Sequence, residues 1–320
     1  MSLLHAHDHG RDHAPGSEPA QGHGPAHSHG HGGSAFAWGI GLNAIYIVVE
    51  LGAGWYADSL ALLSDALHNL SDVVALGVAW FAATLARRKP SAHRTYGFTR
   101  ATILSALFSS ALLCAAMGVI AWESLHRLLD PRPVDGGVVA LVAAFGVLIN
   151  TATALFLAKE RERDLNIRSV WLNMMADAGL SALVALAGVA IALTGWHSID
   201  AAASFVLALA ILVLAASVLR DALNLATDAV PRGIDPAEVR ELLTAQPGVR
   251  EVHDLHIWPL GTTHIALTAH LVMPEPPASD TFLRELNAEL LMRFGIDHTA
   301  IQVERGDGPG GCPDAAADRI

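Results

Sequence analysis

The chain has 320 residues, of which 52% are hydrophobic and only 16% are charged, and its mean hydropathy is +0.39. Soluble globular domains carry about 25% charged residues. The composition therefore excludes an ordinary soluble domain and indicates an integral membrane protein. The formal net charge of -11 at pH 7 does not set the orientation of such a protein, because the Lys and Arg content of its loops carries that signal.

Residues 1–33 form a low-complexity segment rich in Gly, Pro and His. The segment lacks a positively charged start followed by a cleavable apolar run, so we expect a disordered cytoplasmic tail and not a secretory signal peptide. Neutral imidazole is a common ligand for divalent transition metals. The tail is therefore either a loose metal collector or a solubilising segment whose histidines matter little. Its histidines are His5, His7, His9, His13, His23, His27, His29 and His31.

Six apolar stretches of about 20 residues or more follow the tail. A helix rises about 1.5 Å per residue, so each stretch is long enough to cross a hydrocarbon core about 30 Å thick. We therefore predict an all-α membrane bundle of six transmembrane helices within residues 34–230. The expected spans are 36–56, 59–85, 102–125, 137–158, 170–193 and 199–219.

Basic residues gather in two of the loops between these spans. Cytoplasmic loops carry an excess of Lys and Arg, so we expect these loops and both chain termini on the cytoplasmic side. Compact loops and the lack of a eukaryotic sorting signal fit a bacterial inner membrane. The basic residues are Arg87, Arg88, Lys89, Arg94 and Arg100 after the second span and Lys159, Arg161, Arg163 and Arg168 after the fourth.

A soluble domain is expected over residues 231–305. Asp235 followed by Pro236 is typical of a helix start, and Gly295 is typical of a helix end. The expected order of helix, strand, strand, helix and strand favours a small cytoplasmic α+β domain of the ferredoxin-like type. The helices are expected over 237–246 and 279–295, the strands over 249–258, 263–273 and 299–304, and a flexible tail over 306–320.

Two polar pairs with a spacing of four residues interrupt the apolar spans. His68 and Asp72 lie in the second span, and Asn173 and Asp177 lie in the fifth. Positions four apart project from one face of a helix. Charged side chains inside a membrane cost roughly 3 kcal/mol on insertion scales and usually line an ion path. One imidazole, two carboxylates and one amide oxygen suit a four-coordinate divalent transition metal, whereas the alternative is polar contact between helices without a metal.

Five segments of the chain together resemble the cation diffusion facilitator family. They are SLALLSDALHNLSD (59–72), RTYGFTRATILSA (94–106), NIRSVWLNMMAD (166–177), VHDLHIWPLG (252–261) and HIALTAHLV (264–272). The likeness covers about residues 35–305. It implies six transmembrane helices, a cytoplasmic ferredoxin-like domain, a homodimer, and export of zinc or a similar divalent cation in exchange for protons by alternating access.

The resemblance assigns the transport site to His68 and Asp72 in the second helix and to Asn173 and Asp177 in the fifth. Many zinc exporters of the family have histidine where this chain has Asn173. An amide oxygen is a harder and weaker ligand than imidazole and does not titrate near neutral pH. We therefore expect zinc to be bound less tightly, with manganese, cobalt or cadmium transported relatively better.

The resemblance also implies metal-binding residues outside the spans. It places a regulatory zinc site of the cytoplasmic domain at His253, His270 and Glu304, although a strand histidine is more often packed or solvated than bound to a metal. His93, in the loop before the third span, corresponds to part of a looser metal site. A solvated loop histidine is the competing interpretation there.

Arg100 and Asp228 correspond by resemblance to a charge interlock between the membrane and cytoplasmic parts, near the dimer hinge. Metal binding by the cytoplasmic domains would tighten the dimer there and bias transport. The expected partners are divalent metal ions, protons, the lipid membrane and a second copy of the chain, and no nucleic acid.

Other classes of function fit the sequence less well. An intramembrane metal hydrolase is disfavoured because the chain has no HExxH motif and no obvious nucleophile with a base, so we expect no enzyme. A nucleotide-binding GxxxxGK[ST] loop is also missing, which disfavours an ATP-driven pump. The alternative transporter is a passive metal channel, which needs weak and quickly released sites.

Overall fold

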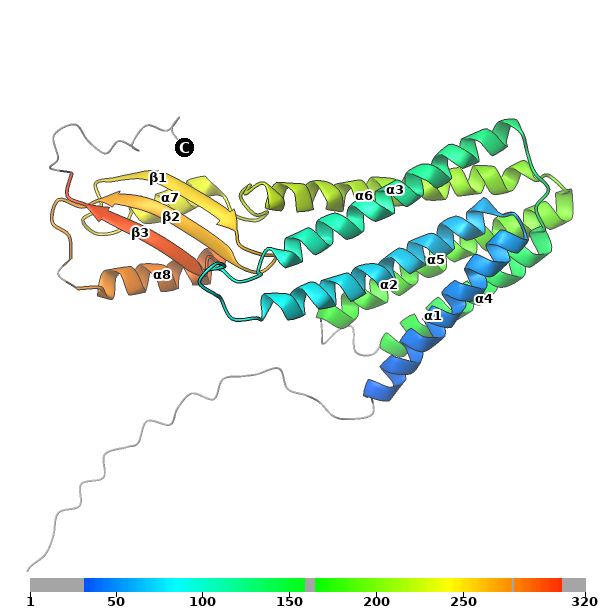
Figure 1. Cartoon of the computed structure of the whole chain (residues 1–320), viewed down its shortest axis with the longest axis horizontal. Coiled ribbons are helices and arrows are strands. Elements are labelled where there is room, and N and C mark those ends of the chain that lie inside the picture. Colours follow the sequence, from blue (N-terminus) through cyan, green and yellow to red (C-terminus); the bar gives the residue numbers. More distant parts are fainter. Residues whose placement is uncertain (1–31, 159–164, 278, 307–320) are drawn as a thin grey trace, which may run out of the picture. The chain divides into compact units, whose positions relative to one another are not determined.

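The computed structural model describes residues 32–158, 165–277 and 279–306 (Figure 1). The expected N-terminal tail, except Gly32 and Gly33, and the expected C-terminal tail, except Gly306, lie outside the described residues, as does most of the basic loop after the fourth span. Within the described ranges the chain forms six long helices, followed by two shorter helices and three strands.

The long helices follow the six apolar stretches of the sequence. Five of them are long and apolar enough to span a membrane, and the sixth, α1, has a shorter described apolar stretch over Ala44–Tyr56. The predicted fold class, six transmembrane helices and a C-terminal α+β domain, is confirmed. The helices are α1 (Gly32–Tyr56), α2 (Leu60–Ala86), α3 (Ala101–Leu129), α4 (Gly136–Leu157), α5 (Leu165–Thr194) and α6 (Ser198–Ala226).

A buried acid on α6 fixes the N-terminal end of α2. The Ser59 hydroxyl caps α2 by accepting a hydrogen bond from the Leu62 amide at 3.1 Å, and it donates in turn to Asp200. The other Asp200 oxygen accepts from the Leu60 amide at 2.8 Å. Amides in the first turn of a helix have no partner within the helix, so this carboxylate satisfies one of them and ties α2 to α6.

The helices pack in neighbouring pairs, α3 beside α6 and α4 beside α5 (Figure 1). Glycines allow α4 and α5 to approach each other closely. A Cβ atom on Gly188 of α5 would lie 2.4 Å from the Ala140 amide nitrogen of α4, and one on Gly136 would lie 2.6 Å from the Ala192 nitrogen. Helices in membranes gain stability from such close backbone packing, because lipid offers no hydrophobic driving force between them. The pairing of α4 with α5 therefore depends on these two glycines.

The C-terminal domain is an open three-stranded sheet with two helices. Strands β1 and β2 are antiparallel and β2 and β3 parallel, in the order β1-β2-β3, so α8 forms the crossover between the two parallel strands. Asp235 caps α7, and Gly295 ends α8 with a left-handed φ of 68°. The elements are α7 (Pro236–Thr244), β1 (Glu251–Pro259), β2 (Ile265–Val272), α8 (Thr281–Phe294) and β3 (His298–Glu304).

The two faces of this sheet differ in chemistry. Leu267, Ala269 and Leu271 of β2 point toward the helices and form the domain core with Leu243 of α7 and Leu290 of α8. Alternate residues of a strand point to opposite faces, so His270 and its cross-strand neighbour His253 lie on the other face. The sheet therefore separates an apolar core from a face that carries histidine and carboxylate side chains.

Candidate metal sites

Three side chains from α2 and α5 converge within the membrane bundle. His68, Asp72 and Asp177 each offer a ligand atom within 4.8 Å of the other two. The His68 Nε2 atom lies 3.6 Å from Asp177 Oδ1, and the two side chains are 16% and 4% exposed. Helical spacing puts His68 and Asp72 on one face of α2, and the packing of α5 against α2 supplies the second acid.

Two buried atoms of this cluster lack hydrogen-bond partners. Within the described part of the chain, His68 Nδ1 and Asp177 Oδ1 are both buried without a hydrogen-bond partner, since the 3.6 Å contact of Asp177 Oδ1 with His68 Nε2 is too long for a hydrogen bond. Leaving a buried polar group unsatisfied costs about 1 to 3 kcal/mol, so native structures rarely keep one without a reason. An imidazole and two carboxylates are ligands that divalent transition metals accept. The geometry therefore fits a bound dication.

Asn173 lies beside the cluster, one helical turn before Asp177. Its Nδ2 atom donates a hydrogen bond to Asp177 Oδ2 at 3.1 Å, and the residue is otherwise exposed. In this orientation the amide nitrogen faces the cluster. A cation would require the amide oxygen there, which a half-turn of the terminal amide supplies without moving the helix.

A cavity of about 500 Å³ reaches the cluster from one end of the helices. It is lined by Asp72 and Ala83 of α2, by Thr102 and Ser109 of α3, and by Ala215 of α6. Small and hydroxylated side chains leave room along this path. Asp72 is thus reachable from the end at which α2 finishes and α3 begins.

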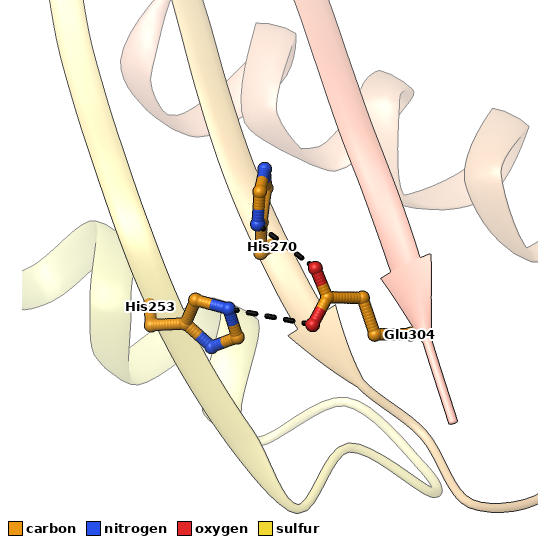
Figure 2. Close-up of side chains that lie close together, drawn as sticks. All are labelled: His253, His270 and Glu304. Atoms are coloured by element: carbon orange, nitrogen blue, oxygen red, sulfur yellow. Dashed lines mark ion pairs between the residues drawn. The ribbon is translucent and has the colours of Figure 1, made fainter. Parts of the chain in front are cut away.

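A second cluster lies on the polar face of the C-terminal sheet (Figure 2). The Glu304 carboxylate, from β3, lies between two imidazoles: Oε1 is 3.0 Å from His270 Nδ1, and Oε2 is 3.5 Å from His253 Nε2 (Figure 2). The His253 side chain is 6% exposed, and neither of its ring nitrogens has a hydrogen-bond partner among the described residues. The three ligands come from three different strands: His253 of β1 is the cross-strand partner of His270 of β2, and Glu304 of β3 is paired with Val272, two residues further along β2.

A β-bulge brings a further carboxylate to this cluster. The register of β1 shifts between His253 and His256, and Asp254 within the bulge has a left-handed φ of 51°. Its carboxylate lies 2.9 Å from His256 Nε2 and 3.5 Å from His270 Nε2. Asp tolerates this backbone conformation better than most residues. Sequence reasoning missed Asp254, because strict alternation along β1 would direct its side chain away from His253.

The remaining predicted residues lie outside both clusters. Arg100 Nη2 and Asp228 Oδ1 form an ion pair at 2.7 Å, with side chains 54% and 48% exposed. His93 is exposed in the loop before α3 and belongs to neither ligand cluster found among the described residues.

Sequence reasoning also missed the structural roles of Arg127 and Asp200, which are both buried. Asp200 lies in the first turn of α6 but accepts its hydrogen bonds from Ser59 and the Leu60 amide at the start of α2, a contact that no local sequence signal indicates.

Long apolar helices, a buried ligand cluster between two of them and a small α+β domain define the class: an integral membrane protein that transports ions. The cation efflux transmembrane domain model matches residues 37–225, and the cation efflux protein cytoplasmic domain model matches residues 231–306. The chain belongs to the cation diffusion facilitator family of zinc and divalent metal exporters.

Relatives align over most of the chain. The zinc transporter ZitB of Escherichia coli is 31% identical over 304 residues, covering 94% of this chain and 93% of ZitB. The metal cation efflux system protein CzcD of Cupriavidus metallidurans is 33% identical and covers 83% of this chain and 84% of CzcD. A solved structure of the metal-bound C-terminal domain of the CzcD transporter is 40% identical, covers 22% of this chain and 99% of that domain, and has a TM-score of 0.20.

Proposed function

We propose that the protein is a proton-coupled antiporter that exports zinc, or a related divalent transition metal, from the cytoplasm by alternating access. The transported ion binds at His68, Asp72, Asn173 and Asp177. The observation that carries this proposal is the buried cluster on α2 and α5, where a histidine nitrogen and a carboxylate oxygen lack hydrogen-bond partners among the described residues. Relatives named as a zinc transporter and as a metal cation efflux system protein support the choice of cargo.

Proton exchange follows from the chemistry of the ligands. A metal ion needs neutral His68 and ionised Asp72 and Asp177, so protons and metal compete for the same lone pairs. A site that opens to a more acidic compartment releases its metal and takes up protons. The return of the protonated site to the cytoplasmic side then brings protons inward. Asn173 contributes nothing to this exchange, because an amide does not titrate near neutral pH.

The two ends of α2 differ, because a cavity opens one end and side-chain contacts close the other. This difference supports alternating access. The cavity reaches Asp72 from the end where α2 meets α3. At the opposite end, Ser59 and Asp200 join α2 to α6. Arg127 of α3 closes the same end by donating to the Asp58 carbonyl at 2.7 Å and pairing with its carboxylate at 2.8 Å. This arrangement suits a state that is open toward the side we assign to the cytoplasm.

We assign the C-terminal cluster a regulatory role. His253, His270 and Glu304 bind a zinc ion there, and Zn²⁺ is thus a regulatory ion as well as cargo. The protein acts as a homodimer, in which metal binding by the C-terminal domains tightens the contact between copies. The ion pair of Arg100 with Asp228 transmits that change to the helices. His93 is a weaker loop ligand in this scheme.

We place the protein in a bacterial inner membrane with both termini in the cytoplasm. The bacterial relatives and the basic loops support this placement. The domain scheme assigns residues 1–33 to a disordered His-rich tail, 34–230 to the transmembrane domain, 231–305 to the cytoplasmic domain and 306–320 to a flexible tail.

The direct test is metal flux in liposomes that contain the purified full-length protein. An antiporter accumulates Zn²⁺ faster when a pH gradient is imposed, and the vesicle interior becomes less acidic as metal enters. Asp177→Asn removes one ligand charge and should reduce zinc flux at least tenfold, whereas Ser217→Ala on the exposed side of α6 should not change it. A zinc flux that is independent of the pH gradient and runs only down the zinc gradient would instead establish a passive channel.

A further inference from the structure

A second pair of acids is buried in the bundle, next to the proposed metal site. Glu50 of α1 and Asp65 of α2 both have 0% exposure. Glu50 accepts hydrogen bonds from Tyr46 Oη at 2.8 Å and from Asn69 Nδ2 at 3.4 Å. Asp65 Oδ2 accepts from the Ser181 hydroxyl of α5 at 2.7 Å. Asn69 lies one turn after Asp65 on α2, so its hydrogen bond to Glu50 places the two acids near each other across the contact between α1 and α2.

Their surroundings offer little to balance two negative charges. Among the described residues, neither carboxylate forms an ion pair with Lys or Arg, and Asp65 Oδ1 has no hydrogen-bond partner. The titratable groups that face the pair are Tyr46 on α1, His68 on α2 and Asp177 on α5. Two neighbouring carboxylates that are both fully buried cannot both ionise at an acceptable cost. One bound proton removes both the repulsion and the unpaired oxygen.

The shape of the site holds the pair in place. On α4, a Cβ atom on Gly146 would lie 2.1 Å from the Tyr46 hydroxyl oxygen and 3.1 Å from Ser181 Oγ. The hydroxyl that donates to Glu50 therefore occupies a space that only glycine leaves open. Four helices thus contribute to the site: α1, α2 and α5 through hydrogen bonds, and α4 through the missing side chain.

We propose that Glu50 and Asp65 form a proton-binding site, distinct from the metal ligands, that holds one shared proton in the metal-free protein and releases it when a dication binds. The inference deepens the proposed antiport by adding a proton that the ligands themselves do not carry. Asp65 lies one turn before His68 on α2, and Ser181 lies one turn after Asp177 on α5. A dication at the ligand cluster favours ionised neighbours, so the shared O–H bond breaks and the proton leaves to water.

The simpler alternative is that these hydrogen bonds only hold α1, α2 and α5 together. Replacing the acids by their amides separates the two roles, because Gln and Asn keep the size of the side chains and much of the hydrogen bonding but have no proton to release. A purely structural pair predicts that the amide variants bind zinc and release as many protons as the unchanged protein.

The test counts the protons released when the full-length protein, purified in detergent, is saturated with Zn²⁺ in a weakly buffered solution near pH 7. The Glu50→Gln/Asp65→Asn double variant should bind the same amount of zinc and release about one proton fewer per chain. Ser124→Ala, which removes a buried hydroxyl that bonds Ser204 on α6, should leave the count unchanged. An equal count for the double variant and the unchanged protein would overturn the proposal.

Two further variants complete the test. Glu50→Gln alone serves if the double variant does not fold, and a shared proton predicts the same loss of about one proton. A His68→Ala substitution should prevent a dication from binding beside the pair. In that background, the proteins with the intact and the substituted acid pair should release equal numbers of protons. A persisting difference in proton release would contradict the link to the metal site. The liposome experiment can fail to show antiport while the variants still differ in proton release. The proposed antiport and the proposed proton-binding site can therefore be rejected independently.

Discussion

At the scale of single residues, the proposed transport site combines ligands that differ in charge and in donor atom. Asp72 and Asp177 supply negative charge that a dication offsets, and His68 supplies a softer nitrogen ligand. Asn173 supplies only a neutral oxygen, and in this structure it directs its nitrogen to Asp177. The proposed site therefore has one imidazole where two would favour zinc, and we expect this difference to set its preference among metals.

Substituting Asn173→His should restore a second imidazole. Zinc transport should increase relative to manganese and cobalt transport, by about tenfold if the new ligand contributes about 1.4 kcal/mol. The measurement is initial uptake of each metal into liposomes at matched concentrations. Asn173→Gln keeps an amide and serves as the control. Unchanged relative rates for the three metals would show that Asn173 does not set selectivity.

Asp297, in the loop before β3, gives a residue-scale prediction about pH. Burial alone would raise the pKa of this carboxyl, but hydrogen bonds from His264 and from the Ile265 amide outweigh burial and hold the pKa below its usual value. A lowered pKa in the folded state means that ionised Asp297 stabilises the start of β2 at neutral pH. This contribution disappears as the pH falls below about 4 and through the folded-state pKa.

The Asp297→Asn variant should therefore exchange its β2 amides faster than the unchanged protein at neutral pH, and the difference should shrink in acid. Hydrogen–deuterium exchange of the peptide around residues 264–272 measures it. Asp280→Asn, at a helix start without a side-chain capping bond, is the control. A difference that stays constant down to about pH 3 would rule out ionisation of Asp297 as its cause.

At the scale of helices and strands, the apolar stretches of the sequence predicted where the long helices lie. The sequence predicted fewer of the contacts between their side chains. The six apolar stretches became the six long helices because bilayer thickness fixes their length. Helical spacing also placed His68 and Asp72 on one face of α2. The lack of a hydrogen-bond partner at His68 Nδ1 and the bulge at Asp254 could not be predicted, because each depends on a neighbouring element distant in sequence. Helical spacing placed Asn173 beside Asp177, but it does not decide which end of the amide faces the acid.

The contact of α4 with α5 predicts an effect of glycine substitution at a distance from the ligands. Gly188→Ala would place a Cβ atom 2.4 Å from the backbone of α4, which cannot move aside as a flexible side chain does. The helices should separate at a cost of about 1 to 3 kcal/mol. Thermal unfolding in detergent and zinc flux measure the effect. Gly179→Ala in the same helix meets nothing within 4 Å and should be neutral; equal behaviour of the two variants would exclude close packing as the reason for Gly188.

The ion pair between the start of α3 and the segment after α6 gives a second prediction at this scale. Both side chains are half exposed, so the pair itself contributes about 0 to 1 kcal/mol. Arg100→Asp or Asp228→Arg alone should lower zinc flux about twofold to fivefold through like-charge repulsion. The double charge swap should restore the flux, and no restoration would show that the two residues act independently.

At the scale of the whole molecule, metal binding is proposed for the membrane cluster and the C-terminal sheet, and the sequence leaves it open for the His-rich tail. Of the two clusters among the described residues, the membrane cluster lies between long helices, so the proposed transport depends on it. The other two places would obscure any count of bound metal. A protein without residues 1–33 and with His253→Ala and Glu304→Ala isolates the membrane cluster.

X-ray absorption spectroscopy of zinc bound to this stripped protein tests the central claim most directly. The proposed site predicts one zinc ion per chain with one imidazole nitrogen and three oxygen ligands, at about 2.0 to 2.2 Å. Adding Asn173→His should convert the ligands to two nitrogens and two oxygens. A stripped protein that binds no zinc, or one whose zinc has two or more imidazoles before that substitution, would contradict the assignment of the transport site to α2 and α5.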